Sequence, residues 1–351
     1  MPATETFTAG LPVEVGQIHR ELKKLWDESD GAMTRASLIN LAVYSEALDS
    51  LGKNTAIISQ LTEDHACRAI VIAADPEAGE SGVEAWISAH CHVGHAGRKQ
   101  VCSEQLSFLI RGGHCGLLPN IVFAQLDSDL PLYLWWQEEF RPPLDPQLWA
   151  WVDRVIYDSR DWRNFDEQMR LVEQAQEEAR QRIVLCDLNW IRLVHLRLAL
   201  AQFFDHPLTH HHLKAFRRLE IEHAPGFRST ALLLIGWLAG QLGWDGGGDD
   251  APNFWICKDD RSREIQVTLQ EKGGEPISLC RITTDCAEFR IEHKPAADLL
   301  DVHFGRVNGR KMQQVLPAGK NDVVELLREE LMRGGPHRVY LRAISKVREL
   351  M

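Results

Sequence analysis

Two strand-length apolar runs on either side of an amphipathic segment constrain the fold of this chain more than any other feature. SLINLAVY occupies residues 37–44, and CRAIVIAAD, which is rich in β-branched residues, occupies residues 67–75. Between them, Leu51, Ile58 and Leu61 recur at helical spacing. A strand, a helix and a strand of these lengths predict a βαβ unit, and such a unit requires its two strands to pair in parallel.

The remaining pattern up to residue 162 extends this unit into a larger sheet. The turn GHAGRK separates two strand-length runs, which predicts a hairpin beside the parallel strands. The predicted elements are strands over 83–93, 101–112, 130–136 and 154–159 and a helix over 117–128. We therefore expect an α/β N-terminal domain over residues 1–162, with a mixed sheet and flanking helices.

After residue 162 the pattern changes to segregated helices and strands. Three helices come first, over residues 165–182, 187–205 and 229–244. Asp187 opens the second of them, where a carboxylate caps a helix by accepting a backbone N–H. Strand-like runs then fill most of 254–317, and Asn308-Gly309 is a strong signal for a hairpin turn. This pattern indicates an α+β C-terminal domain over residues 163–351, with a mainly antiparallel sheet.

The charge and the cysteine pattern exclude several classes of protein. With a formal net charge of −11, the chain lacks the basic excess that binding to nucleic acid or to an anionic membrane surface requires. The most apolar stretch, at 230–240, is too short to cross a bilayer. The eight cysteines are scattered without a C-x-x-C pair, which favours a reducing compartment. We therefore expect a cytoplasmic protein with no nucleic-acid or membrane partner.

The stretch HCHVGHAGRKQVC at 90–102 has the composition of a metal site. On a strand, His90 and His92 point to the same side and can share a metal, with His95 and Cys102 as further ligands. The spacing matches no zinc finger or knuckle, and the end of a hairpin explains the same residues. We expect no bound metal here. A metal-dependent enzyme that uses His90, His92 and Cys102 remains as an alternative.

Other catalytic signatures are absent from the sequence. It contains no G-x-G-x-x-G after a strand, no phosphate-binding loop, no H-E-x-x-H and no G-x-S-x-G. The acidic pair Glu138-Glu139 is interpreted as solvated loop charge. We therefore expect no catalytic residues and no cofactor. Cys280 and Cys286 flank RITTD, and a thiol redox sensor remains as a second alternative if their Cα atoms lie within about 7 Å.

Tryptophan is abundant in this chain, with eleven residues. Trp135 and Trp136 end one predicted strand, and Trp190 and Arg192 lie in the segment DLNWIR. Because Trp and Arg dominate protein–protein hot spots, these four residues form a candidate partner interface. The alternative is that Trp190 packs into the core of its own domain.

The ordered motifs of the chain resemble a known family. DHACRAIVIA, CSEQLSFLIRGG, DLPLYLWW, RVIYDS, DLNWIRLVHLRLALAQFFD, LIGWLAGQLGW and DVVELLREEL follow one another along nearly its whole length. Together they resemble OpcA, the glucose-6-phosphate dehydrogenase assembly proteins of cyanobacteria and actinobacteria. The resemblance implies a non-catalytic allosteric activator that binds the dehydrogenase, promotes its active oligomer and controls entry into the oxidative pentose phosphate pathway. It also implies a link to thiol redox state through thioredoxin.

Overall fold

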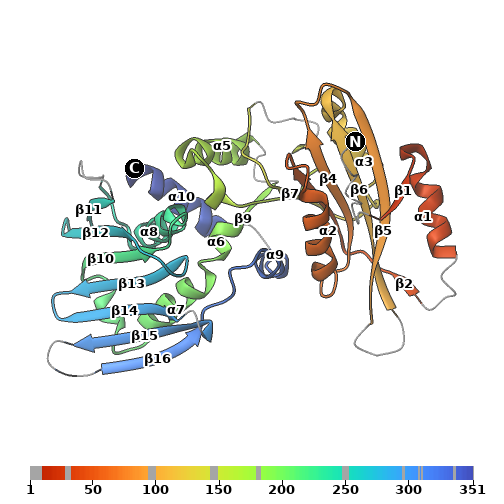
Figure 1. Cartoon of the computed structure of the whole chain (residues 1–351). Coiled ribbons are helices and arrows are strands. Elements are labelled where there is room, and N and C mark those ends of the chain that lie inside the picture. Colours follow the sequence, from red (N-terminus) through yellow and green to blue (C-terminus); the bar gives the residue numbers. More distant parts are fainter. Residues whose placement is uncertain are drawn as a thin grey trace. The chain divides into compact units, whose positions relative to one another are not determined.

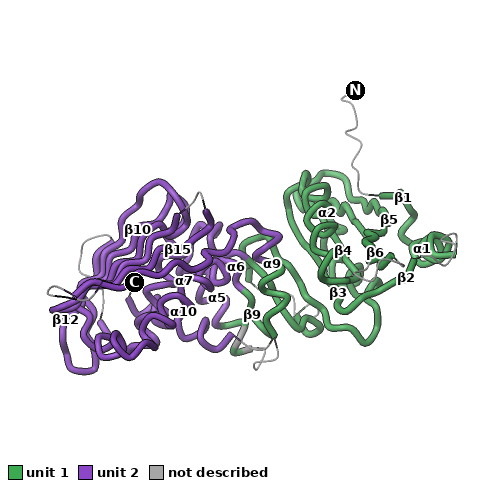
Figure 2. The backbone as a smooth tube through the Cα atoms, turned by 90° about the horizontal axis from the view of Figure 1, so that it is seen from below, with its two compact units in different colours: residues 1–157, 174–186, 327–335 green, residues 158–173, 187–326, 336–351 purple. Residues whose placement is uncertain are grey.

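The chain forms two compact units, each assembled from three separate segments (Figure 2). The structure, a computed structural model, describes residues 10–27, 33–93, 100–142, 149–178, 183–246, 253–294, 297–306, 309, 311–334 and 337–350. The first unit comprises residues 1–157, 174–186 and 327–335, and the second comprises residues 158–173, 187–326 and 336–351. The first change of unit lies close to the predicted boundary at 162. Unlike the two contiguous domains that we expected, however, the chain returns twice to the first unit.

A nine-stranded mixed sheet forms the centre of the first unit (Figure 1). Its strands are β1 (Leu11–Val13), β2 (Met33–Arg35), β3 (Ile39–Ser45), β4 (Cys67–Asp75), β5 (Gly82–Val93), β6 (Gln100–Arg111), β7 (Leu132–Trp136), β8 (Arg154–Tyr157) and β9 (Val184–Asp187). Their order is β1-β5-β6-β4-β3-β7-β8-β9, and β2 also pairs with β6. Strands β6, β4, β3, β7 and β8 pair in parallel, whereas β5 joins β6 as an antiparallel hairpin. The predicted mixed α/β sheet is confirmed.

The predicted βαβ unit is formed by β3, α2 (Ser50–Leu61) and β4. Leu51, Ile58 and Leu61 are fully buried, so the helical face seen in the sequence is the face that packs inward. Both β3 and β4 are buried along almost their whole length, as parallel strands covered on two faces are. The other described helices before β7 are α1 (Ile18–Asp27) and α3 (Leu118–Ala124).

A seven-stranded sheet forms the centre of the second unit. Its strands are β10 (Phe216–His223), β11 (Phe254–Lys258), β12 (Glu264–Glu271), β13 (Ile277–Thr284), β14 (Ala287–Lys294), β15 (Leu299–Arg306) and β16 (Lys311–Pro317). Their order is β11-β12-β10-β13-β14-β15-β16, and every neighbouring pair is antiparallel except β10 with β12. The predicted mainly antiparallel sheet is confirmed.

The remaining helices are α5 (Phe165–Glu178), α6 (Leu188–Ile191), α7 (Val194–Asp205), α8 (Arg228–Leu242), α9 (Val323–Met332) and α10 (Arg338–Leu350). Helix α8 is apolar around its circumference and is therefore buried, with α10 packed against it. A Cβ at Gly236 would lie 2.4 Å from the carbonyl oxygen of Ala343, so this close approach of two helices requires glycine.

The helix predicted over 187–205 is interrupted at Arg192 and Leu193, which separate α6 from α7. At this interruption the guanidinium of Arg192 binds the carboxylate of Asp158, with 2.7 Å between Nη1 and Oδ1. Among the described residues, no helix has both the length and the apolar character that crossing a bilayer requires.

Candidate functional site

The order of the parallel strands reverses at β3, which lies between β4 and β7. In doubly wound sheets, ligands bind outside the carboxyl ends of the strands at such a reversal point. Here that position is formed by Ser45 and Glu46, which end and follow β3, and by Gln137 and Glu138, which follow β7. We call these four residues the switch-point cluster and take it as the candidate functional site.

Glu138 accepts a hydrogen bond from a backbone N–H at the position where an anionic ligand would bind. Its Oε1 accepts the backbone N–H of Glu46 at 2.6 Å and the hydroxyl of Ser45 at 3.3 Å. Phosphate groups bind in αβ proteins through backbone N–H groups of the loop that follows a strand and leads into a helix. In this chain, a carboxylate of the protein itself takes that position.

Neighbouring side chains complete the hydrogen bonding of the switch-point cluster. Arg141 donates two hydrogen bonds to the carboxylate of Glu46, at 3.1 and 2.8 Å. The amides of Gln137 and Asn54 exchange hydrogen bonds of 3.1 and 2.9 Å. These polar groups therefore find hydrogen-bond partners within the protein and need no ligand to supply them.

An aromatic pair lies beside the cluster. The rings of Tyr44 and Trp136 stack with centroids 4.2 Å apart. Burial, followed by the nearby carboxylate of Glu46, raises the pKa of Tyr44 above its ordinary value. The phenol therefore stays protonated at neutral pH and donates to Glu46 at 3.3 Å, which makes it a poor general base.

The interpretation of Glu138 as a solvated loop charge was wrong. Its contacts with Ser45 and Glu46 span more than 90 residues of sequence, so no local pattern could indicate them. A signal was nevertheless available, because both segments directly follow predicted parallel strands. The carboxyl ends of such strands meet at one edge of the sheet.

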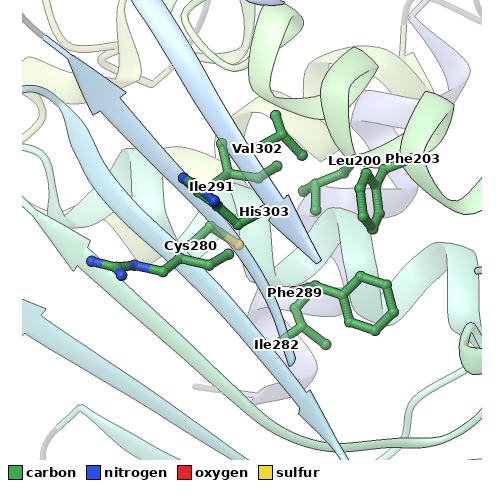
Figure 3. A pocket seen from close by; sticks show the side chains of 9 residues that line it. Leu200, Phe203, Cys280, Ile282, Phe289, Ile291, Val302 and His303 are labelled. Atoms are coloured by element: carbon green, nitrogen blue, oxygen red, sulfur yellow. The ribbon is translucent and has the colours of Figure 1, made fainter. Parts of the chain in front are cut away.

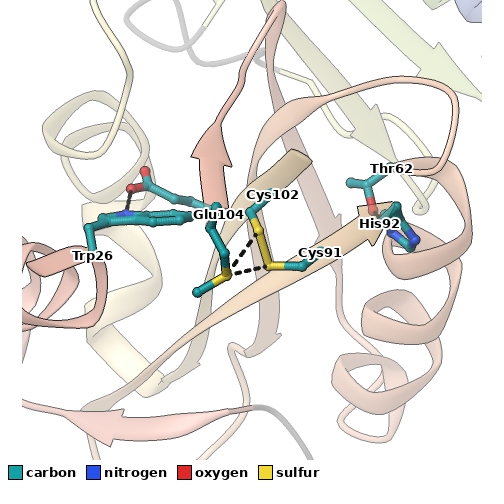
Figure 4. Close-up of a disulfide and its surroundings, with 7 residues drawn as sticks. Trp26, Thr62, Cys91, His92, Cys102 and Glu104 are labelled. Atoms are coloured by element: carbon teal, nitrogen blue, oxygen red, sulfur yellow. Dashed lines mark hydrogen bonds between the residues drawn. A yellow bond between two sulfur atoms is a disulfide. The ribbon is translucent and has the colours of Figure 1, made fainter. Parts of the chain in front are cut away.

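Cys91 and Cys102 form a disulfide between the directly paired strands β5 and β6 (Figure 4). The sulfur of Met33 lies 3.5 Å from each of the two cysteine sulfurs. The disulfide corrects two expectations. The cysteines are not all reduced, and Cys102 has no free thiolate to offer a metal.

His90 and His92 lie on the opposite side of the hairpin from the disulfide. The ring of His90 bonds to Gln105 at 2.9 Å, and that of His92 bonds to Thr62 at 3.1 Å. Directly paired residues of neighbouring strands share a face, and successive residues alternate, so Cys102 cannot converge with the two histidines. The alternative metal site at His90, His92 and Cys102 is therefore wrong. His95 lies outside the described residues.

The structure does not bring Cys280 and Cys286 together. Cys280 is buried in β13 opposite Ile291, whereas Cys286 is exposed in the turn after Thr284. The four steps from residue 280 to residue 284 alone span about 13 Å of strand, beyond the Cα separation of about 7 Å that a disulfide permits. Burial raises the pKa of Cys280 to about 12. Figure 3 shows its sulfur in a small hollow with Phe289 and Ile291, too tight for a water molecule.

The four candidate interface residues differ in accessibility. Trp135 and Trp190 are 4% and 3% exposed, and the guanidinium of Arg192 is held by Asp158. Trp190 packs on Tyr340, and Arg197 lies 3.5 Å above its ring centroid. Trp135 and Trp190 thus serve the interior of their own units, whereas Arg192, held in an ion pair, and Trp136 are partly exposed.

Asp187 forms the centre of a buried polar cluster in the second unit. Its Oδ1 accepts the backbone N–H groups of Ser159 and Asn189 at 3.0 and 2.9 Å. Its Oδ2 accepts the hydroxyls of Ser159 and Tyr340 at 2.7 and 2.9 Å. The bond from Asn189 confirms the predicted cap of α6. Burial, as the largest cause, raises the pKa of Asp187 to about 6.

Two family models match most of the chain. Residues 58–175 match the glucose-6-phosphate dehydrogenase subunit N-terminal domain, and residues 183–344 match the C-terminal domain of the same subunit. A protein of Nostoc punctiforme named OxPP cycle protein OpcA is 26% identical over 82% of this chain and 66% of its own length. A protein of the same name from Synechococcus elongatus is 24% identical over 87% of this chain and 72% of its own length. The chain thus spans about two thirds of these relatives.

Solved structures with a similar course of the chain are distant in sequence. An NAD binding oxidoreductase from Klebsiella pneumoniae is 10% identical, with a TM-score of 0.47 over 90% of this chain and 96% of that one. An aldose-aldose oxidoreductase from Caulobacter crescentus is 8% identical, with a TM-score of 0.48 over 88% and 94%. Likeness at this level says nothing about function.

Proposed function

Because this chain belongs to the OpcA family, matched through both of its domains, we propose that it is a non-catalytic assembly factor and allosteric activator of glucose-6-phosphate dehydrogenase. In this role it controls the entry of glucose 6-phosphate into the oxidative pentose phosphate pathway, and it works in the cytoplasm. The family match over residues 58–175 and 183–344 is the observation that carries the proposal.

Activation through assembly requires a difference in affinity. A partner shifts an equilibrium between dehydrogenase states only by as much as it binds one state more tightly than the other. The proposed mechanism is therefore preferential binding to the active conformation or oligomer. The same coupling makes the active dehydrogenase bind this chain more tightly than the inactive one does.

The switch-point cluster supports a non-catalytic role. Glu138 holds the backbone N–H of Glu46, and the two carboxylates place negative charge where a dinucleotide phosphate would bind. Tyr44 beside them is held protonated. We expect the purified chain not to oxidise glucose 6-phosphate with either nicotinamide cofactor, because the position of the cofactor phosphate is taken by the protein.

The partner surface is sought among accessible aromatic side chains. Of the four sequence candidates, we retain Trp136, and we add Trp151, which is 65% exposed and contacts Phe123 at 5.6 Å between ring centroids. Exposed tryptophan is the side chain with the largest share of hot-spot energy at interfaces. The buried Trp190 provides a contrasting position, whose replacement acts through folding of the second unit.

Co-elution with the dehydrogenase tests the proposal. Purified full chain is mixed with glucose-6-phosphate dehydrogenase of the same organism and separated by size, with the mass of each peak measured. We expect a species larger than the dehydrogenase alone that contains both proteins. In Trp151→Ala, we expect a complex weakened at least tenfold with an unchanged melting temperature. Separate elution of the two wild-type proteins, in both reducing and oxidising buffer, contradicts the proposal.

The proposal includes a thiol partner of the thioredoxin class, acting on the Cys91–Cys102 disulfide. Thiol–disulfide exchange converts this bond to two thiols while the thioredoxin dithiol becomes a disulfide. Alkylation after treatment with reduced thioredoxin should label Cys91 and Cys102 in addition to the exposed Cys286 and the partly exposed Cys115, which serve as internal controls. Absence of label from Cys91 and Cys102 contradicts this assignment.

A further inference from the structure

The seven-stranded sheet of the second unit has one charged, solvent-exposed face. Helices α7 and α8 pack against its other face, through β15 and β10; Figure 2 labels α7 beside β15. On the exposed face, Arg218 and Glu288 are 52% and 53% exposed. An antiparallel sheet of this size with one open face is either solvated or an interface. The order of charges on the exposed face distinguishes these two cases.

Strand β14 carries a self-complementary charge sequence on this face. Because side chains alternate, Glu288, Arg290, Glu292 and Lys294 point to the same side, whereas Phe289 and its alternate neighbours point into the core. The four outward charges therefore read minus, plus, minus, plus along the strand. Read in the opposite direction they are plus, minus, plus, minus, so the row matches a reversed copy of itself at every position.

The exposure of these side chains leaves them available to a second molecule. Arg290 and Glu292 are 39% and 34% exposed, and Glu288 and Lys294 are each 53% exposed. Within the chain, Arg290 pairs with Glu292 on its own strand, and Lys294 pairs with Asp301, whose side chain is only 5% exposed. The exposed pair of Arg290 with Glu292 contributes little to folding, so stability does not explain its arrangement.

The neighbouring strand β15 follows the same order. His303 is paired in register with Arg290, and Asp301 is paired with Glu292. Asp301 accepts from Lys294, from Gln313 at 3.0 Å and from His303 at 3.1 Å. A basic row thus runs beside an acidic row, about 7 Å away along the strands. The order is confined to β14 and β15: Leu279 of β13 is paired with Glu292, and Glu220 and Glu222 of β10 are both acidic.

We propose that this chain self-associates through the exposed face of the second sheet. The two-fold axis runs across the strands at Ile291, midway between Arg290 and Glu292, so that β14 of one copy crosses β14 of the other in the opposite direction. Arg290 then faces Glu292 of the second copy, and Glu288 faces Lys294. A two-fold interface requires a self-complementary surface of this kind. A dehydrogenase partner on the same face would need no such symmetry.

The area of the face suits a dimer. The whole face of seven strands, spaced about 4.8 Å apart and roughly eight residues long, covers about 900 Å² per copy, close to the roughly 800 Å² per partner of a standard interface. The matching charges lie on β14 and β15 within this face. The contact is polar apart from the stems of the long side chains and Val315, which is 50% exposed. Complementary charges then set the register, and the dimer should weaken with salt.

Two single charge reversals and their mixture test the proposal. We expect wild-type full chain to sediment as a dimer at low salt and to dissociate at about 0.5 M sodium chloride, where exposed charges are screened. Arg290→Glu and Glu292→Arg each place like charges opposite each other, and each should weaken self-association at least tenfold. An equimolar mixture of the two variants restores every opposite pair and should form a heterodimer.

The control and the contrary outcomes are equally specific. Lys53→Glu makes the same charge change on exposed α2 of the first unit and should leave the dimer intact. Three results overturn the proposal: a wild-type monomer at low salt, a dimer that both single variants preserve, or a mixture of the variants that stays monomeric. If wild type is monomeric alone and Arg290→Glu abolishes co-elution with the dehydrogenase, the face belongs to that partner instead.

Discussion

Two carboxylates, one in each unit, accept backbone N–H groups beside a strand end, yet their surroundings differ. Asp187 is 2% exposed and accepts four hydrogen bonds, from Ser159, Asn189 and Tyr340. Glu138 is only partly buried and accepts two, from Ser45 and the backbone of Glu46. Asp187 joins separate segments of the second unit, and Glu138 binds the ends of two strands in the switch-point cluster of the first unit.

The difference shows how similar chemistry can hold a fold together or close a site. Removing a fully buried acceptor leaves each of its donors without a partner and without water. Removing a partly exposed acceptor lets water replace it at small cost. We therefore expect the stability of this protein to depend strongly on Asp187 and weakly on Glu138.

The largest expected effect is the loss of stability in Asp187→Ala. The substitution leaves two backbone N–H groups and the hydroxyls of Ser159 and Tyr340 without an acceptor. It should lower the free energy of unfolding by about 3 kcal/mol or more. Asp187→Asn keeps an oxygen for the backbone groups and offers its NH₂ to the hydroxyls, so we expect about half that loss. Chemical denaturation measures both, and equal losses in the two variants would refute this account of the cluster.

The second largest expected effect is the pH dependence of stability that arises from Asp187. The pKa of Asp187 is raised to about 6 in the folded protein, from an ordinary value of 3.8. Between these pH values the folded protein binds more protons than the unfolded chain. The contribution of Asp187 to the free energy of unfolding is therefore full below pH 4 and is lost as the pH rises through 6. The loss should be on the order of 3 kcal/mol and absent from Asp187→Asn. If both proteins show the same slope between pH 4 and 6, another group is responsible.

The smallest expected effect belongs to Glu138→Ala. Because Glu138 is partly exposed, water can enter the space that its side chain leaves and bind the Glu46 N–H, so the free energy of unfolding should fall by about 1 kcal/mol or less. The matched variant Glu138→Gln keeps an acceptor, so its free energy of unfolding should fall by less. A loss in Glu138→Ala as large as that in Asp187→Ala would abolish the distinction between the two carboxylates.

The sequence predicted elements and caps well because these depend on near neighbours. The buried face of α2 follows from the spacing of Leu51, Ile58 and Leu61, and the cap at Asp187 follows from its place before a helix. The closure of the switch point was missed because Glu138 and Glu46 meet only when β3 and β7 pair. In the same way, the disulfide depends on the register of β5 and β6, which places Cys91 opposite Cys102.

The accessibility of the tryptophans was also beyond the reach of the sequence. Trp190 and Arg192 have the composition of a hot spot, but Tyr340 and Asp158, which bury and bind them, come from distant segments. Composition alone does not distinguish an interface from a core, because both are rich in the same large side chains.

The activity of glucose-6-phosphate dehydrogenase with and without this protein is the most direct test of the proposed role. The dehydrogenase of the same organism is assayed at sub-saturating glucose 6-phosphate while purified full chain is titrated in, under reducing and under oxidising conditions. We predict a saturable rise in rate that follows the appearance of the larger assembly, and no turnover by this chain alone. An unchanged rate in both redox conditions, at concentrations where the two proteins are shown to be folded, would contradict the account.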